Sequence, residues 1–314
     1  QDNLMRKPKL IATSVVRGSQ QGESHGGVYL IDFENQVVEQ HVDWNTGEID
    51  FAGRGADRGL RGITFDAGDI YIAASDELFC YDQNFRIKRS WRNPFLKHCH
   101  EICRRDRKIF LTSTGFDSLL VFDIDVAAFI WGIHIQRDTQ GDWHGNIFDP
   151  SSSVGPGPGN RSHINSTFID DDGIYVSGLH TGALLYINSN NEVREFCSLP
   201  SGTHNARPFR DGVLFNDTAN NHVRCVTPDS AWAMPILVYP EKELSFRGVD
   251  NSKVARQGFA RGLTLLSEDL VAVGSSPSTV SLYELRSGRC VDAVNISMDI
   301  RNAIHGLEVW PYED

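Results

Sequence analysis

Six residues that could do chemistry recur at the same place in a repeated phrase of the sequence. The phrase is a short apolar strand, an acidic turn and a second apolar strand, and each copy opens with histidine or arginine. We call these residues the basic column: Arg61, His100, His163, His204, Arg261 and His305. Neutral imidazole is a common ligand of transition metals, and guanidinium binds carboxylate, sulfate or phosphate through two parallel hydrogen bonds. The column therefore indicates a site that combines imidazole chemistry with anion binding.

Four short strands are predicted after each column residue, because apolar, β-branched and aromatic residues alternate between turn residues. In the copy that begins at Arg61, these strands cover residues 62–65, 70–74, 78–81 and 87–91. The following copies repeat this order over residues 100–135, 163–199, 204–239 and 261–296. Four consecutive antiparallel strands joined by tight turns are typical of one blade of a β-propeller.

The two ends of the chain are predicted to share one blade. The last copy, 305–310, supplies a single strand, and the N-terminal strands 10–16, 27–32 and 37–43 supply the three that it lacks. Such sharing removes open sheet edges. The sequence therefore predicts an all-β fold, a six-bladed β-propeller closed by N-terminal strands that complete the last blade, as one domain over residues 1–314. A β-sandwich or a solenoid is the alternative, but a solenoid does not need its last repeat completed by the N-terminus.

The site is predicted at one face of this propeller. The first strand of every blade lines the central channel, so the basic column should ring one mouth of the channel. The loops between the second and third strands reach the same face and carry His25, His180 and His222. The long insertions 136–162 and 240–260 are expected on this face too. Whether the first insertion is a lid or an assembly contact stays open.

The leading functional prediction is a metal-dependent enzyme of the oxygenase or lyase type. Four imidazoles on one axis suit a divalent transition metal, with iron as the first choice and Mn, Zn, Ni or Cu as other options. The predicted ligands are His100, His163, His204 and His305. Four neutral ligands leave the charge of the metal uncompensated, which favours a small anionic substrate.

Substrate binding and catalysis are assigned to residues around these ligands. The guanidinium groups of Arg61 and Arg261 are predicted to bind the anionic group of the substrate. Further predicted substrate contacts are the three loop histidines, His25, His180 and His222. The predicted catalytic residues are His163, Asn165 and Glu308, the last as a base or as a partner that orients an imidazole.

Two other functions stay open at this point. The first is a metal-free transferase in which a column histidine is the nucleophile. The second is a propeller without enzymatic activity that binds a ligand or a protein. Histidines at such positions also serve structural hydrogen-bond networks or line a water-filled channel.

The blade sequences resemble those of the PAPS-independent aryl sulfotransferases, which are also six-bladed propellers. The resemblance rests on His163-Ile-Asn-Ser and on His204-Asn-Ala-Arg, which is followed by Asp-Gly and an apolar strand. It implies a histidine nucleophile that carries the sulfuryl group, with His163, Asn165 and His204 at the matching positions. The chain departs from that family at Leu179-His180, where the family tends to have arginine. The four histidines are also similar in kind to those that hold iron in the carotenoid cleavage oxygenases, which are seven-bladed.

Charge and composition argue against several classes of partner. The formal net charge of −11 opposes general binding to nucleic acid or to anionic membranes. No apolar run is long enough for a membrane-spanning helix, and six cysteines in 314 residues do not suggest a disulfide framework. Because no signal peptide is visible, the expected location is cytoplasmic. The chain begins at Gln1, so removal of a leader stays open, and the oligomeric state is not indicated.

Overall fold

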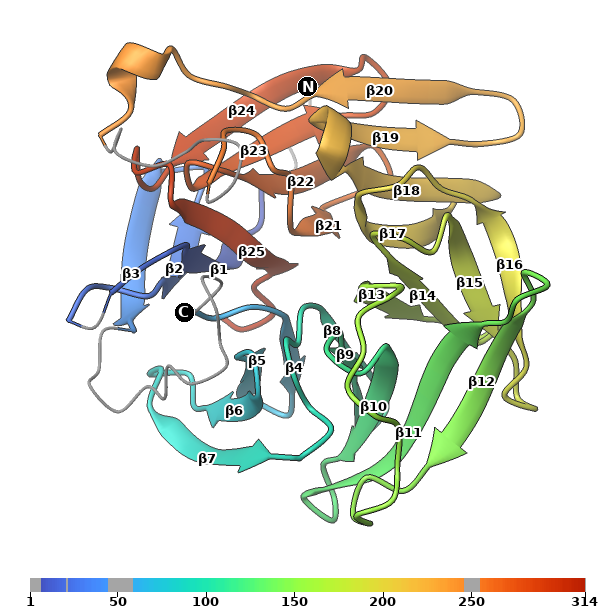
Figure 1. Ribbon diagram of the computed structural model, residues 1–314. Helices are drawn as coiled ribbons and strands as arrows, with labels where there is room; N and C mark the ends of the chain where they lie inside the picture. The colour runs from blue at the N-terminus through green and yellow to red at the C-terminus, as the bar shows by residue number, and fades with distance from the viewer. Residues whose placement is uncertain (1–6, 21, 45–58, 246–254, 314) are drawn as a thin grey trace. The chain divides into compact units, whose positions relative to one another are not determined.

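Strands make up almost all of the regular structure (Figure 1). The computed structural model describes residues 7–20, 22–44, 59–245 and 255–313. Across these residues the helices are two 3-10 turns, η1 (Thr218–Asn220) and η2 (Glu241–Glu243). None of the described helices has the length and apolar character needed to cross a lipid bilayer. The chain divides into two compact units: unit 1 combines Gln1–Leu60 with Met234–Asp314, and unit 2 is Arg61–Ala233.

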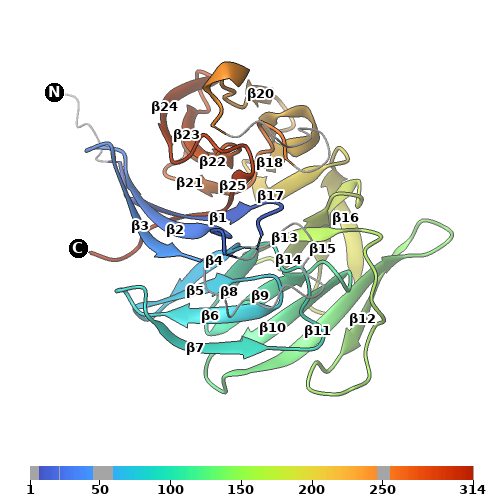
Figure 2. The same cartoon turned by 60° about the vertical axis from the view of Figure 1, so that its left-hand side comes forward.

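Unit 2 is built from four antiparallel sheets that follow one another along the chain, each with its strands in sequence order. The first sheet is β4 (Ile63–Asp66), β5 (Asp69–Ala73), β6 (Glu77–Tyr81) and β7 (Ile87–Arg92), and Figure 2 shows β5, β6 and β7 in that order. The second sheet is β8 (Ile102–Arg105), β9 (Lys108–Ser113), β10 (Ser118–Asp123), β11 (Ala128–Arg137) and β12 (Trp143–Phe148). The third is β13 (Ile164–Ile169), β14 (Ile174–Gly178), β15 (Ala183–Ile187) and β16 (Val193–Ser198). The fourth is β17 (Thr203–Phe209), β18 (Gly212–Asp217), β19 (His222–Val226) and β20 (Ala231–Pro235), whose last residues belong to unit 1.

Unit 1 contains two four-stranded sheets. One is β21 (Leu263–Leu265), β22 (Leu270–Ser275), β23 (Thr279–Glu284) and β24 (Arg289–Asn295). The other has the order β25 (Asn302–Val309), β1 (Leu10–Val16), β2 (Gly27–Asp32) and β3 (Val37–Asp43). The strand nearest the C-terminus thus pairs antiparallel with the first strand of the chain. The predicted sharing of one blade between the two ends is confirmed.

Turn chemistry explains why the strands end where they do. Between β4 and β5, Ala67 and Gly68 have φ values of 46° and 88°. Two successive left-handed residues form the type of two-residue turn that matches the twist of paired strands. Asp66 and Asp69 flank this turn as the last cross-strand pair of the hairpin. The acidic and glycine residues of the repeated phrase therefore position both strands.

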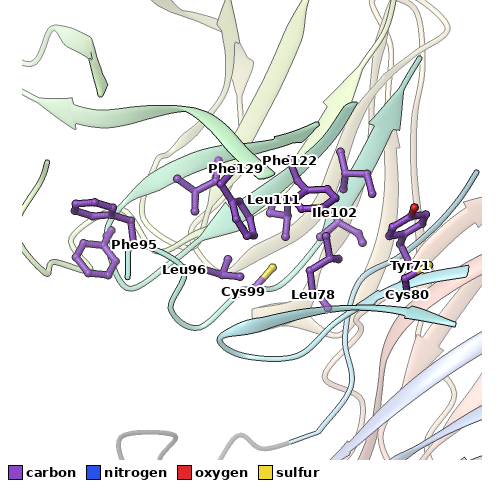
Figure 3. Close-up of a cluster of buried hydrophobic side chains, with 14 residues drawn as sticks. Tyr71, Leu78, Cys80, Phe95, Leu96, Cys99, Ile102, Leu111, Phe122 and Phe129 are labelled. Atoms are coloured by element: carbon purple, nitrogen blue, oxygen red, sulfur yellow. The ribbon is translucent and has the colours of Figure 1, made fainter. Parts of the chain in front are cut away.

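The core of unit 2 lies between neighbouring sheets. One buried apolar cluster, drawn in Figure 3, combines Tyr71 and Leu78 of the first sheet with Leu111 and Phe122 of the second. The segment between β7 and β8 contributes Phe95, Leu96 and Cys99 to the same cluster. Burying each large apolar side chain contributes about 1.5–3 kcal/mol. Packing of this kind fixes the position of the first sheet relative to the second.

The insertion 136–162 differs from a simple loop. Residues Trp143–Phe148 form β12 (Figure 1). Every residue of β12 pairs antiparallel with a residue of β11. The second sheet therefore has five strands, with β12 at the edge opposite β8. The pattern of the insertion did not indicate this strand, because only its first residue, Trp143, is buried. Of the insertion 240–260, residues 246–254 lie outside the described part of the chain.

The observed sheets confirm the predicted fold class, an all-β, six-bladed β-propeller. The three N-terminal strands, 10–16, 27–32 and 37–43, have the bounds that the sequence predicted. In the first repeat, the strands differ from the predicted bounds by one residue at most. All six cysteines are free, as their small number indicated.

Candidate functional site

The basic column lies on or just before the first strand of each sheet. In unit 2, Arg61 and His100 precede β4 and β8 by two residues, His163 precedes β13 by one, and His204 is the second residue of β17. In unit 1, Arg261 precedes β21 by two residues, and His305 is the fourth residue of β25. All are buried except His163, which is half-buried.

Backbone and side-chain bonds tie the strand starts of unit 2 together. The first strands contact one another in the order β4, β8, β13 and β17. Gly62 N–H donates to the carbonyl of His100 at 2.9 Å, and Glu101 N–H donates to the carbonyl of Asn165 at 3.3 Å. A Cβ on Gly62 would lie 2.7 Å from that His100 oxygen, so the close approach requires glycine. The column residues of neighbouring sheets are therefore held at fixed positions.

His100 and His163 form a histidine pair. Their ring centroids lie 5.2 Å apart with the planes at 71°, an edge-to-face arrangement. Nδ1 of His100 lies 2.7 Å from the carbonyl oxygen of His98 and 2.8 Å from Oγ1 of Thr114. The carbonyl can only accept, and the Thr114 hydroxyl donates its own hydrogen to the carbonyl of Ile164. Nδ1 therefore carries the proton of a neutral His100, and Nε2 has the lone pair.

Hydroxyl residues recur at a constant distance in sequence from the basic column, and two of them contact a column histidine. His204 Nδ1 lies 2.9 Å from Oγ1 of Thr218, and this pair has the same separation of 14 residues as His100 and Thr114. The same offset from Arg61, His163 and Arg261 gives Ser75, Ser177 and Ser275, all of them buried. Sequence reasoning missed these residues, although their constant offset was readable from the repeats.

His163 is held by a carboxylate that the sequence did not point to. Asp117 accepts the backbone N–H groups of Arg161 at 2.7 Å and of Ser162 and His163 at 3.1 Å each. His163 has φ of 51°, a left-handed conformation that is uncommon outside glycine. A Cβ on Gly178 would lie 2.3 Å from the His163 carbonyl oxygen, so close backbone packing also holds this turn. Burial raises the pKa of Asp117, and the three N–H bonds oppose the rise.

The asparagines beside the column form a scaffold network. Asn205 Nδ2 donates to Oε2 of Glu101 at 2.6 Å, and Asn216 donates to Oδ1 of Asn205 at 3.0 Å. Asn165 Nδ2 donates to the carbonyl of Thr203 at 3.0 Å, and its oxygen accepts from Ser166. The amide nitrogen of Asn165 thus joins β13 to β17, while its oxygen is bonded within β13.

Unit 1 holds the remaining predicted site residues. His25 is fully buried, with Nδ1 2.6 Å from the Ser19 hydroxyl. His305 is buried on β25, and Glu308 on the same strand has Oε2 3.4 Å from the Thr264 hydroxyl.

Arg261 belongs to an arginine cluster on Phe259. The guanidinium carbons of Arg17, Arg261 and Arg256 lie 4.3, 4.5 and 4.9 Å from the centre of the Phe259 ring. Burial, and after it the charge of Arg17, lowers the pKa of Arg256 from its usual value. Three guanidinium groups on one ring create a strongly positive environment. Arg17 and Arg256 were not singled out as site residues by the sequence.

The two remaining loop histidines lie in the connections that were predicted to hold them. His180 is exposed in the β14–β15 connection and lines a pocket that is described below. His222 begins β19, is half-buried, and has Nδ1 2.6 Å from the carbonyl oxygen of Asn220.

The donor set for a metal is incomplete in the described residues. Within them, no three His, Cys, Asp or Glu side chains converge as ligands of one ion. His100 and His163 provide two imidazoles in contact, and catalytic zinc sites use three protein ligands. His305 lies in unit 1, whereas the other predicted ligands lie in unit 2. The four-histidine metal site stays a prediction.

Comparison with solved structures supports the fold. A chain in the crystal structure of a nidogen/laminin complex matches with a TM-score of 0.60 and 9% identity, over 95% of this chain and 97% of that one. A protein of unknown function from Bacteroides caccae gives a TM-score of 0.54 and 10% identity, over 96% and 98%. The C-terminal WD40 domain of Sif2 gives a TM-score of 0.51 and 10% identity, over 94% and 88%.

Neither a protein-family model nor a curated protein sequence matches the chain. At identities of 9–10%, likeness to the solved structures extends to the fold alone. The resemblance to aryl sulfotransferases is not confirmed at the level of the family. Structure and comparisons together show that the chain has a six-bladed β-propeller fold.

Proposed function

We propose that the histidine pair of unit 2 is the reaction centre of an enzyme that acts on a small anionic substrate by acid–base catalysis, as lyases do. The observation that carries the proposal is the 5.2 Å edge-to-face contact of His100 and His163, with the proton of His100 fixed on Nδ1. His100 can then accept a proton at Nε2. At this separation a proton on one imidazole disfavours a proton on the other, so the pair favours one base and one acid.

Positive charge supports the choice of an anionic substrate. Arg61 is permanently charged, and its guanidinium donates to the carbonyl of Cys99 at 2.7 Å, next to His100 in the sequence. Because Arg61 is 0% exposed, it acts on a substrate through its field rather than by direct contact. The half-buried His163 is the member of the pair that solvent and substrate reach.

A divalent transition metal bound to the pair is the second candidate. His100 donates Nδ1–H to a backbone carbonyl, which is the arrangement that commonly orients metal-ligating imidazoles. Such a metal would act as a Lewis acid toward the substrate anion. It requires at least one ligand beyond His100 and His163, for which the predicted candidate within unit 2 is His204. We assign no reaction step to this metal.

Turnover of small carboxylates, sulfates and phosphates, followed by proton NMR, tests the leading proposal. His100→Gln and His163→Gln should each lower the rate about 100-fold to 10,000-fold, the usual contribution of a positioned acid or base. His41→Gln is the control, because His41 lies outside the site and pairs with Glu39 at 3.1 Å. Activity that survives the His100→Gln, His163→Gln double variant refutes the proposal.

Elemental analysis of the purified protein separates the two candidates. Stoichiometric metal that is lost in His100→Ala and His163→Ala would favour the metal site. A covalent sulfuryl adduct on His163, trapped with an aryl sulfate, would instead favour the nucleophilic mechanism. If the protein binds anions but turns over none of them, a binding propeller without catalysis is indicated.

A further inference from the structure

Unit 2 contains a pocket of about 450 Å³ beside the insertion 136–162. Residues from the end of β11, the start of β12, the returning Gly157-Pro158-Gly159 segment and the β14–β15 connection line it. This volume lies in the range of sites for small organic ligands. The fifth strand therefore helps to form this cavity.

Positive groups predominate in the lining of the pocket. The permanently charged Arg137 and Arg161 line it together with one acidic residue, Asp117, and the imidazoles of His134 and His180. The Asp117 carboxylate already accepts the backbone N–H groups of Arg161, Ser162 and His163, so its charge is directed at the backbone. In a chain with a net charge of −11, such a lining is a local exception that favours an anionic ligand.

Arg161 is available to such a ligand. Its side chain is exposed, and within the described ranges its guanidinium makes no ion pair or hydrogen bond. Arg137 donates one hydrogen bond, from Nε to the carbonyl oxygen of Gly141 at 3.0 Å. Its Nη2 lies 3.9 Å from Oε1 of Glu195, at the outer limit of an ion pair. Both guanidinium groups keep donors for a carboxylate or phosphate.

Trp143 supplies an independent observation. Its side chain is 9% exposed and lines the pocket, and its indole N–H is buried without a hydrogen-bond acceptor among the residues that the structure describes. Buried N–H groups are nearly always satisfied, so this donor has the capacity to bond an acceptor on a ligand. The guanidinium of Arg137 lies 5.4 Å from the centre of the indole ring. The indole of Trp143 therefore offers a hydrogen-bond donor and an apolar ring surface next to the guanidinium of Arg137.

We infer that this pocket binds a small organic anion with an aromatic or other apolar body. Its carboxylate or phosphate is bound by Arg161 and Arg137, the indole N–H of Trp143 donates to an oxygen of the ligand, and the Trp143 ring and Pro158 contact the apolar part. The inference is independent of acid–base catalysis by the histidine pair, because it concerns binding and uses other side chains.

Isothermal titration calorimetry with benzoate, phenyl phosphate and the neutral benzyl alcohol tests the inference on the whole protein. At least one anion should bind, benzyl alcohol should not, and the preferred anion identifies the headgroup. Arg161→Gln should weaken binding about 10-fold to 100-fold through loss of a charge-assisted bond. Trp143→Phe, which keeps a ring and removes the N–H, should weaken it about 5-fold.

Arg89→Gln is the matched control. Arg89 is also exposed and lies 5.0 Å from the ring of Trp91, but it lines no part of this pocket. It should leave the affinity unchanged. Binding of neither anion at millimolar concentration, equal binding of benzyl alcohol, or an equal loss in Arg89→Gln would overturn the inference. If Trp143→Phe does not fold, the exposed Arg161 still decides the outcome.

Discussion

Removal of the Asp117 carboxylate should destabilise the protein and release the turn that positions His163. The carboxylate is 4% exposed and accepts backbone N–H groups at 2.7, 3.1 and 3.1 Å. Each lost bond of this kind costs about 1 kcal/mol net, so Asp117→Ala should lower the free energy of unfolding by about 3 kcal/mol. At about 2.1 cal/mol/K per residue of unfolding entropy, this corresponds to a fall in Tm of about 4–5 °C.

Scanning calorimetry measures the stability, and amide hydrogen exchange at residues 161–163 reports the turn. The matched control is Asp138→Ala in the insertion 136–162. Asp138 also accepts two backbone N–H groups, from Gln140 and Asp142, each at 2.9 Å, but it is exposed. Water can replace that acceptor, so the loss should stay below about 1 kcal/mol. If Asp117→Ala costs no more than Asp138→Ala, or if exchange at residues 161–163 is unchanged, the reasoning is wrong.

Three further predictions concern the same region. The pKa of Asp117 is raised on folding, so the folded state binds more protons than the unfolded state. The contribution of this group to stability should therefore fall as pH rises from about 4 through its folded pKa. Asp117→Asn should remove this slope in denaturation curves measured from about pH 4 to 7. Gly62→Ala should destabilise by about 1–3 kcal/mol because its Cβ would meet the His100 oxygen, whereas Gly157→Ala, with nothing within 4 Å, should change stability by less than about 0.5 kcal/mol in the same assay. Thr114→Val should cost about 2 kcal/mol in urea denaturation, since it removes the acceptor of His100 and the donor to Ile164, and Thr114→Ser should restore most of the loss.

The strands and their order were predictable because the signals that specify them are local. Alternating apolar residues and acidic or glycine turns, such as Asp66 to Asp69, fix where a strand begins and ends. The copy at His305 lacked three strands and the N-terminus offered three, so the pairing of β25 with β1 followed from counting. Strand β12 was missed because a mostly exposed strand lacks a two-residue apolar period.

The sequence by itself determined the repeat, the sharing of one blade and the place of each column residue. Only the tertiary structure decided which side chains meet. Asp117 binds the backbone of residues 161–163, and Glu101 binds Asn205 across 104 residues of sequence. The contact of His100 with His163 and the gathering of three arginines on Phe259 likewise depend on how neighbouring sheets pack. The repeat pattern specifies each sheet through local alternation, but the side chains between sheets are brought together by packing, for which a single sequence carries no local signal.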